Sequence, residues 1–113
     1  MDRQTVLKNT TSYEERLIRA LGDSDEALAY LEAALEEYED TGETEPLLLA
    51  LKDVAKAQGG IGALARRAGI NREHLYRVLS SKSQPRLDKL LAIISGLGFR
   101  VRLESRNALA GRE

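Results

Sequence analysis

The chain has 113 residues, of which 42% are hydrophobic and 31% charged, so it is long enough for one domain with an arm and too short for two large cores. It contains no cysteine and one histidine, which excludes disulfide bonds, thiolate nucleophiles and zinc sites built on cysteines or on several histidines. No apolar run is long enough to cross a bilayer, and no apolar signal segment follows the first methionine. We therefore expect a cytoplasmic protein that needs no cofactor or metal and does not bind a membrane.

The net charge of −1 conceals two halves of opposite sign. Residues 1–50 hold four Lys or Arg against thirteen Asp or Glu, whereas residues 51–113 hold thirteen against five. Between Asp23 and Glu45 there are ten acidic residues and no basic one. The basic half is a candidate for contacts with phosphate groups. An equal alternative is that the two halves neutralise each other within the protein or across a dimer interface.

Helix-capping signals divide the N-terminal half into two helices. Ser12 and Glu15 form a capping box that opens a short helix. Asp23 and Glu26 form a second box, which opens a longer helix ending near Tyr38. Apolar side chains at three-to-four spacing predict the buried face of this longer helix: Ala27, Leu28, Leu31, Ala34, Leu35 and Tyr38.

Four helices are predicted in the C-terminal half, after a linker at residues 40–44. They span residues 46–58, 61–68, 72–79 and 86–95, and glycines or polar loops separate them. The side chains expected to be buried are Leu47, Leu48, Leu51, Val54 and Ala55 in the first of these helices and Leu87, Leu90, Leu91 and Ile94 in the last.

A strand is predicted after the last helix, because residues 99–104 alternate apolar and charged side chains. A lone strand cannot satisfy its own backbone hydrogen-bonding groups, so it is expected to pair with another edge or with the same strand of a second chain. The side chains assigned to this dimer strand are Phe99, Val101 and Leu103. The predicted fold class is therefore all-α with one short C-terminal strand.

Residues 61–80 carry the most informative pattern. Ala65 lets two helices approach closely, and Gly69, four residues later, can adopt the positive φ of a tight turn. Ile70, Leu75 and Val78 then hold the following helix against the preceding one. This spacing is typical of a helix-turn-helix. An ordinary helical hairpin also favours Ala and Gly, so the assignment depends on what the second helix exposes.

The outward positions of that second helix suit contacts with DNA. Arg72 and Arg77 can each form two hydrogen bonds with a guanine or bind a phosphate group. Asn71 is expected to cap the helix rather than to read a base. Tyr76 can pack on a thymine methyl group or bond to a phosphate. Glu73 can accept a hydrogen bond from cytosine or pair with Arg77, four residues on.

The loop and helix start that follow are expected to touch the DNA backbone, since phosphates run alongside a recognition helix. Lys82 and Arg86 occupy these positions. The complete set of predicted DNA-binding residues is Asn71, Arg72, Glu73, Tyr76, Arg77, Ser80, Lys82 and Arg86.

Several stretches of the chain resemble the addiction-module antidote family. They are AYLEAAL at 29–35 with LLALKDVA at 48–55, then GIGALARRAGI at 60–70 with REHLYRVLS at 72–80, and the closing PRL and GLGFRV around the last helix. These family members are HigA-like antitoxins with a lambda-repressor-like (XRE) helix-turn-helix. The resemblance covers residues from about 24 to 104.

The resemblance implies an antitoxin of a type II toxin–antitoxin module. Such a protein neutralises a HigB/RelE-like toxin, a small basic ribonuclease, and represses its own operon by binding double-stranded operator DNA as a homodimer. A basic toxin would complement the acidic helix. The side chains expected to contact it are Glu32, Glu36, Glu37 and Glu39. Pairing of the C-terminal strands could supply the two-fold symmetry, with two recognition helices roughly 34 Å apart.

Three segments follow from this interpretation. Residues 1–44 form an acidic helical segment for toxin or dimer contacts, 45–104 a helix-turn-helix domain with the C-terminal strand, and 105–113 a flexible tail. The main alternative is a stand-alone XRE-type regulator without a toxin. An enzyme is least favoured, because the exposed carboxylates Glu36 and Glu39 lie on a solvated face without a histidine.

Overall fold

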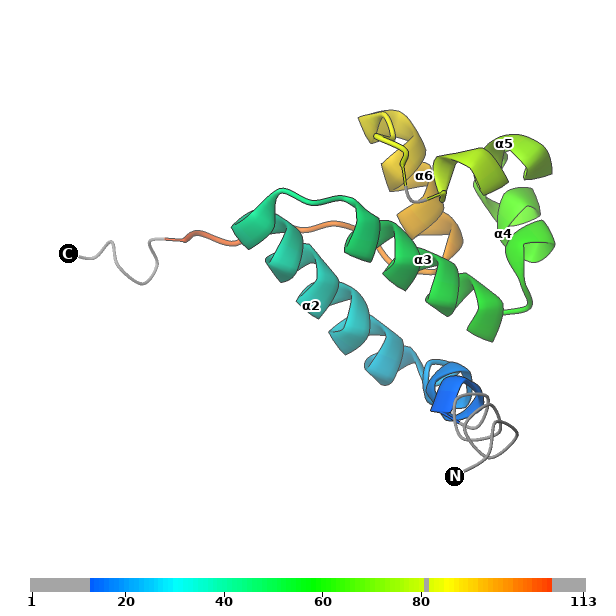
Figure 1. The fold of residues 1–113 in the computed structure, drawn as a ribbon, viewed down its shortest axis with the longest axis horizontal. Helices are drawn as coiled ribbons and strands as arrows, with labels where there is room; N and C mark the ends of the chain where they lie inside the picture. The colour runs from blue at the N-terminus through cyan, green and yellow to red at the C-terminus, as the bar shows by residue number, and fades with distance from the viewer. Residues whose placement is uncertain (1–12, 81, 107–113) are drawn as a thin grey trace, which may run out of the picture.

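The computed structural model describes residues 13–80 and 82–106, and all regular secondary structure in these residues is helical (Figure 1). Residues 13–20 are helical, and the predicted Ser12 cap of this segment lies outside the described residues. The five helices that follow are α2 (Ser24–Thr41), α3 (Glu45–Ala57), α4 (Ile61–Ala68), α5 (Arg72–Val78) and α6 (Leu87–Gly96). The all-helical part of the predicted fold class is confirmed.

Local hydrogen bonds set both ends of α2. The Asp23 carboxylate accepts from the backbone N–H of Asp25 at 2.8 Å and of Glu26 at 3.2 Å, as the capping signal predicts. At the other end Gly42 adopts a left-handed φ of 75° and donates its N–H to the Tyr38 carbonyl. The helix therefore continues past its predicted end, and the linker is reduced to residues 42–44.

The packing of α2 on α3 buries less of α2 than its apolar pattern suggests. Ala27 and Leu31 are buried against the rest of the core, and Ala34 and Leu35 pack beside them. Leu28 and Tyr38 are exposed, so their predicted burial is wrong. The reason is that α3 packs along one side of α2 (Figure 1), and Leu28 and Tyr38 lie outside that contact.

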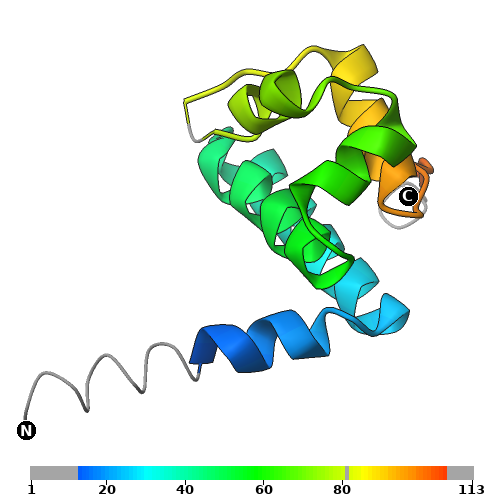
Figure 2. The same cartoon turned by 90° about the vertical axis from the view of Figure 1, so that its right-hand side faces the viewer.

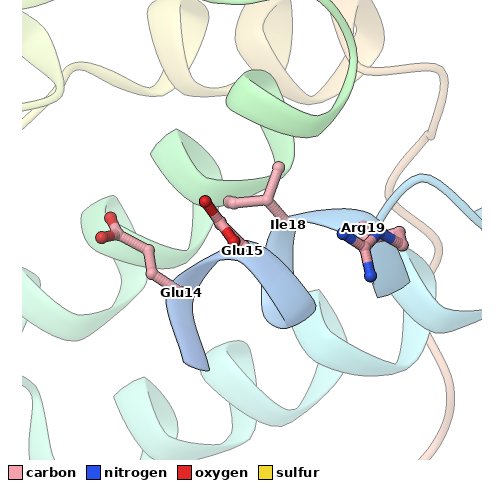
Figure 3. Close-up of a pocket in the computed structure, with 4 residues that line it drawn as sticks. All are labelled: Glu14, Glu15, Ile18 and Arg19. Carbon is pink, nitrogen blue, oxygen red and sulfur yellow. The ribbon is translucent and has the colours of Figure 1, made fainter. Parts of the chain in front are cut away.

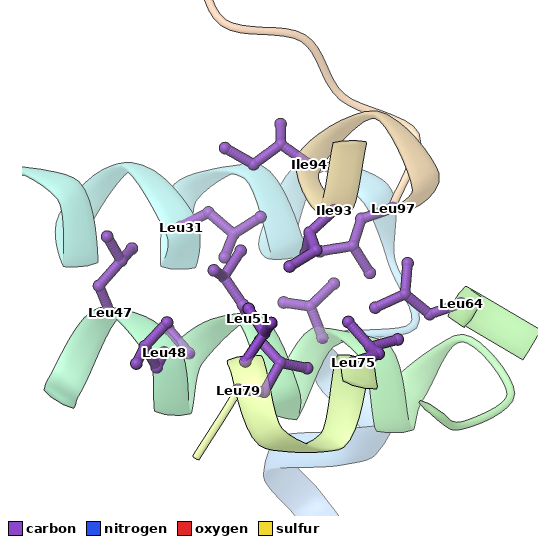
Figure 4. Packing of buried hydrophobic residues seen from close by; sticks show 14 of the residues in the cluster. Leu31, Leu47, Leu48, Leu51, Leu64, Leu75, Leu79, Ile93, Ile94 and Leu97 are labelled. Carbon is purple, nitrogen blue, oxygen red and sulfur yellow. The ribbon is translucent and has the colours of Figure 1, made fainter. Parts of the chain in front are cut away.

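The central helix is α3, which packs against both α2 and α4. All five side chains that the sequence predicts to be buried in it are buried, and so is Asp53. The largest fully buried side chains come from α3, α4, α5 and α6 together, which makes one continuous core (Figure 4). They are Leu48, Leu51, Val54, Leu64, Leu75 and Ile93.

The buried side of α6 differs from the prediction. Leu87 is 68% exposed and Leu91 is 41% exposed, so their predicted burial is wrong, and Ile93 is buried instead. The prediction is confirmed for Ile94, which is buried, and Leu90 packs against the core. The difference arises because the C-terminal half of α6 packs on α4, where Gly96 comes close to α4 side chains. The N-terminal half of α6 extends beyond this contact.

Side-chain hydrogen bonds hold the end of α6. Arg67 donates from Nε to the Gly96 carbonyl at 2.8 Å and from Nη2 to Gln58 Oε1 at 3.0 Å. Gln58 in turn donates from Nε2 to the Leu97 carbonyl at 2.8 Å. Since helix ends leave carbonyl groups without helical partners, these bonds satisfy acceptors at the C-terminus of α6 and tie it to α3 and α4.

The described residues contain no strand, so the predicted C-terminal strand is wrong for the single chain. Residues 99–104 are neither helix nor strand, and Figures 1 and 2 show this segment leaving the end of α6. The physical reason is that a strand needs a partner edge for its backbone groups, and residues 13–80 and 82–106 contain no other strand to supply one. Pairing of this segment with a second chain stays a prediction.

Candidate nucleic-acid interface

A tight turn joins α4 to α5. Gly69 adopts a left-handed φ of 68° and donates its N–H to the Ala65 carbonyl, which ends α4. Ile70 also donates to Ala65, at 3.1 Å, and its side chain is buried. Asn71 then starts α5. The small residue, the glycine and the apolar residue therefore act as the sequence pattern predicts.

The two ends of α5 are held by polar side chains. Asn71 Oδ1 accepts from the backbone N–H of Glu73 at 2.9 Å and of His74 at 3.1 Å, so Asn71 is the N-cap. The Ser80 hydroxyl donates to the Arg77 carbonyl at 2.8 Å just after the helix. Both residues thus use part of their hydrogen-bonding capacity to shape α5.

The remaining side chains of α5 divide into a buried and an exposed face. Leu75 and Val78 are buried. Arg72, Glu73, Tyr76 and Arg77 are exposed and together line one hollow of about 470 Å³. The structure therefore brings together four of the eight residues that the sequence assigns to DNA binding.

The Arg72 side chain lies over the first turn of α4. A Cβ atom placed on Gly62 would lie 3.9 Å from both Cζ and Nε of Arg72. The sequence does not reveal this proximity, because the turn between the helices creates it. In the described part of the chain, neither Arg72 nor Arg77 forms an ion pair, so the alternative pairing of Glu73 with Arg77 is not found.

The two flanking basic residues lie outside the hollow. Lys82 is exposed in the segment after α5. Arg86 is the N-cap residue of α6, and its Nε lies 3.5 Å from Asp88 Oδ1. Both side chains of this pair are largely exposed, so the pair is weak and leaves the guanidinium open to solvent.

The predicted acidic and dimer residues occupy other surfaces. The four glutamates are exposed on α2, which lies on the side of α3 away from α5 (Figure 1). They are Glu32, Glu36, Glu37 and Glu39. Phe99 is half-buried against the core, whereas Val101 is 50% and Leu103 95% exposed.

A second hollow lies on the N-terminal helical segment and is lined by Glu14, Glu15, Ile18 and Arg19 (Figure 3). Glu14 also approaches Lys56 of α3, with Oε2 and Nζ 3.8 Å apart. Across the residues that are described, no three His, Cys, Asp or Glu side chains gather as ligands for a metal ion. None of the described helices has the length and hydrophobicity that a membrane span requires.

Comparison with known proteins identifies a family. The family described as "Probable addiction module antidote protein" matches residues 9–105, which is most of the chain. Neither the curated proteins nor the solved structures include a match. On the family match, the chain belongs to the probable addiction module antidote protein family.

Proposed function

We propose that this antidote neutralises a HigB/RelE-like toxin and represses its own operon as a homodimer that binds double-stranded DNA through an XRE-type helix-turn-helix. Membership of an antidote family implies a toxin partner. The observation that carries the DNA-binding part is the exposed face of α5, where Arg72, Glu73, Tyr76 and Arg77 line one hollow. An antidote acts by binding, and the proposal requires no enzymatic activity.

The composition of this face favours sequence-specific DNA binding over a merely solvated surface. Guanidinium groups bind the O6 and N7 atoms of guanine with two hydrogen bonds, and a phenol ring can contact a thymine methyl group. Two exposed guanidinium groups and one exposed Tyr project from a single helix here. The Asn71 cap and the hydrogen bond from the Ser80 hydroxyl to the Arg77 carbonyl fix the ends of α5, so these side chains project from a defined backbone.

The DNA-binding part is tested by replacing one basic residue on α5 and one beside it. Arg77→Ala should weaken binding to the operator by about 1–3 kcal/mol and relax the preference at one base pair. Lys82→Ala, the matched loss of one positive charge, should weaken all DNA sequences alike and make the salt dependence shallower. Fluorescence anisotropy with operator and scrambled duplexes at several salt concentrations measures both effects.

The ratio of specific to non-specific affinity decides the outcome. If Arg77→Ala and Arg72→Ala both leave that ratio unchanged, α5 is not the reading helix. A dimer that neutralises about eight phosphates should show a log–log salt slope of roughly −7.

The toxin-binding part is supported by the chemistry of α2. Glu32, Glu36 and Glu39 are exposed, and no basic residue lies in this helix. Leu28 and Tyr38 are exposed on the same helix. Apolar side chains surrounded by carboxylates are typical of a protein-docking surface rather than of a purely solvated helix. A basic toxin is complementary to this surface in charge.

Co-expression tests whether a toxin exists. The open reading frame adjacent to this gene is expressed alone and together with the tagged antidote, while host growth and co-purification are followed. The proposal expects a neighbour that arrests growth alone and forms a harmless complex with this chain. A harmless neighbour that does not co-purify would favour the alternative, a stand-alone DNA-binding regulator.

A further inference from the structure

We propose that two copies of the chain pair residues 99–104 as antiparallel strands with Arg102 on the two-fold axis. This inference rests on the homodimer of the proposed function and adds the register of its interface. It follows from the way the segment is anchored, from the surface it exposes and from the charges that each register places opposite one another.

The root of the segment is fixed to the core. The Phe99 backbone N–H donates to the Ile94 carbonyl at 3.1 Å, and the Phe99 side chain packs against the core. Gly98 adopts a positive φ of 95°, which a residue with a side chain rarely adopts. Gln58, the C-cap residue of α3, donates a hydrogen bond to the Leu97 carbonyl. The segment therefore leaves each copy at a defined position, which fixes where a paired partner would lie.

Beyond Phe99 the segment exposes what a strand partner needs. Residues 100–106 are all exposed, and within the described residues their backbone groups form no hydrogen bond. Val101 and Leu103 share one face by their alternation, and both are exposed. Unpaired backbone groups beside an exposed apolar face favour addition of another strand. A second copy carries the same edge, so it supplies a self-complementary partner.

Symmetry limits the register to a few choices. A two-fold axis perpendicular to the paired strands keeps each side chain on its own face, so one residue must lie opposite its own copy. Centring the pair on Val101 places Arg100 opposite Arg102 twice, which brings like charges together. Centring it on Leu103 places Arg102 opposite Glu104 twice but also Arg100 opposite Arg106 twice, so attraction and repulsion offset each other, and Val101 lies opposite Ser105 rather than an apolar side chain.

Centring the pair on Arg102 gives a better arrangement of both charge and apolar surface. Arg100 then lies opposite Glu104 on each side of the axis, and Val101 lies opposite Leu103 twice. A single directly opposed pair of like charges remains, between the two copies of Arg102, and each of them has one Glu104 and one Arg100 of the other copy at diagonal positions. Within the described residues Arg100, Arg102 and Glu104 make no ion pair in the single chain, so their charges are free for this pairing.

Single cysteines report the register directly, because the chain has none of its own. Residues directly opposite in antiparallel strands have Cα atoms about 4.5–5.5 Å apart, which a disulfide can span. Arg102→Cys should therefore oxidise to a cross-linked dimer. Val101→Cys, Leu103→Cys and the charge-matched control Arg100→Cys should stay uncross-linked when oxidised alone. Mixed Val101→Cys and Leu103→Cys chains should cross-link to each other.

Charge exchange gives a second readout that does not need a disulfide. Arg100→Glu should raise the dimer dissociation constant roughly three- to tenfold at low salt, because it faces Glu104 in both symmetric pairs. The double variant Arg100→Glu with Glu104→Arg should restore it. In either rival register Arg100 faces another arginine, so Arg100→Glu would tighten the dimer instead. Sedimentation equilibrium measures the constant.

These experiments distinguish a failure of the Arg102 register from a failure of the proposed function. Cross-linking of Val101→Cys alone or of Leu103→Cys alone would overturn the Arg102 register in favour of a neighbouring one. A lack of cross-linking in every variant, with no effect of charge exchange, would overturn pairing through this segment altogether. Toxin neutralisation and operator binding by the same variants, measured separately, show whether the proposed function holds in either case.

Discussion

At the scale of single residues, the pair of Tyr30 and Asp53 joins α2 to α3. The Tyr30 hydroxyl donates to Asp53 Oδ2 at 2.7 Å, and Asp53 is only 9% exposed. Burial, then the hydrogen bond and the charge of Asp53, raise the pKa of Tyr30 above its ordinary value. The folded state therefore keeps a proton that the unfolded chain releases near pH 10. This contribution to stability is complete below about pH 10 and is lost as the pH rises further.

Replacing Tyr30 tests this link. Tyr30→Phe should lower the free energy of unfolding by about 1–2 kcal/mol near neutral pH, because the Asp53 carboxylate loses a hydrogen-bond donor. It should also remove the part of the alkaline loss of stability that belongs to Tyr30. Urea unfolding at about pH 8 and about pH 11 measures both effects. Tyr38→Phe, on the exposed part of the same helix, is the control and should change stability by less than about 0.5 kcal/mol.

At the scale of elements, Gly96 sets how closely α6 approaches α4. Replacing glycine by alanine in a helix ordinarily stabilises it. Here a Cβ atom on Gly96 would lie 2.8 Å from Leu64 Cδ1 and 3.2 Å from Ala68 Cβ. Leu64 is fully buried, so it has little room to move. The close approach of the two helices therefore reverses the usual effect of the substitution.

Gly96→Ala should consequently lower the free energy of unfolding by about 1–3 kcal/mol. The denaturant midpoint should fall without a change in slope. Ser95→Ala, at the exposed neighbouring position, gives the matched control and should change stability by no more than about 0.5 kcal/mol. A Gly96→Ala protein as stable as the parent would show that α4 and α6 can separate at no cost.

Elements were predictable from the sequence where a local signal determines them. The caps at Asp23, Gly69 and Asn71 act within a few residues of themselves, so the ends that they set were predicted correctly. The face of α6 was predicted only in part: Ile94 is buried as expected, but Leu87 has the same apolar character as Ile93 and only distant packing decides which of the two is buried. The strand at residues 99–104 does not form in the single chain, since its formation depends on a partner edge.

In the candidate site, too, local features could be predicted from the sequence and features that depend on distant packing could not. The exposed face of α5 could be predicted, because its helical period and the buried Leu75 and Val78 determine which side chains point outward. The position of Arg72 over Gly62 could not, since it depends on the angle between two helices rather than on either one. The residue type determines the chemistry of Arg72, and the fold determines the direction in which its side chain points.

At the scale of the whole molecule, opposite charges are separated in space. The acidic α2 and the basic residues of α5 lie on different sides of α3 (Figure 1). This arrangement lets one chain attract a basic partner and a polyanion at separate surfaces. It disfavours the alternative in which the two halves neutralise each other within one chain.

The combined variant Glu32→Gln, Glu36→Gln and Glu39→Gln tests this separation. It keeps the side-chain shapes and removes three charges, so capture of the toxin should slow by roughly tenfold at low salt and by much less at about 0.5 M salt. Operator affinity should not weaken. Stopped-flow association rates and anisotropy measure the two properties. Equal slowing at every salt concentration would show that the glutamates act through contacts other than charge.

Arg72 lies so close to Gly62 that a side chain larger than that of alanine at position 62 of α4 would redirect a side chain of α5. An alanine at 62 would meet the guanidinium at ordinary contact distance, but a larger side chain would displace it from the first turn of α4. Under the proposed DNA-binding role of α5, substitutions at Gly62 would change operator preference through a residue that need not itself touch DNA, while every residue of α5 stays in place.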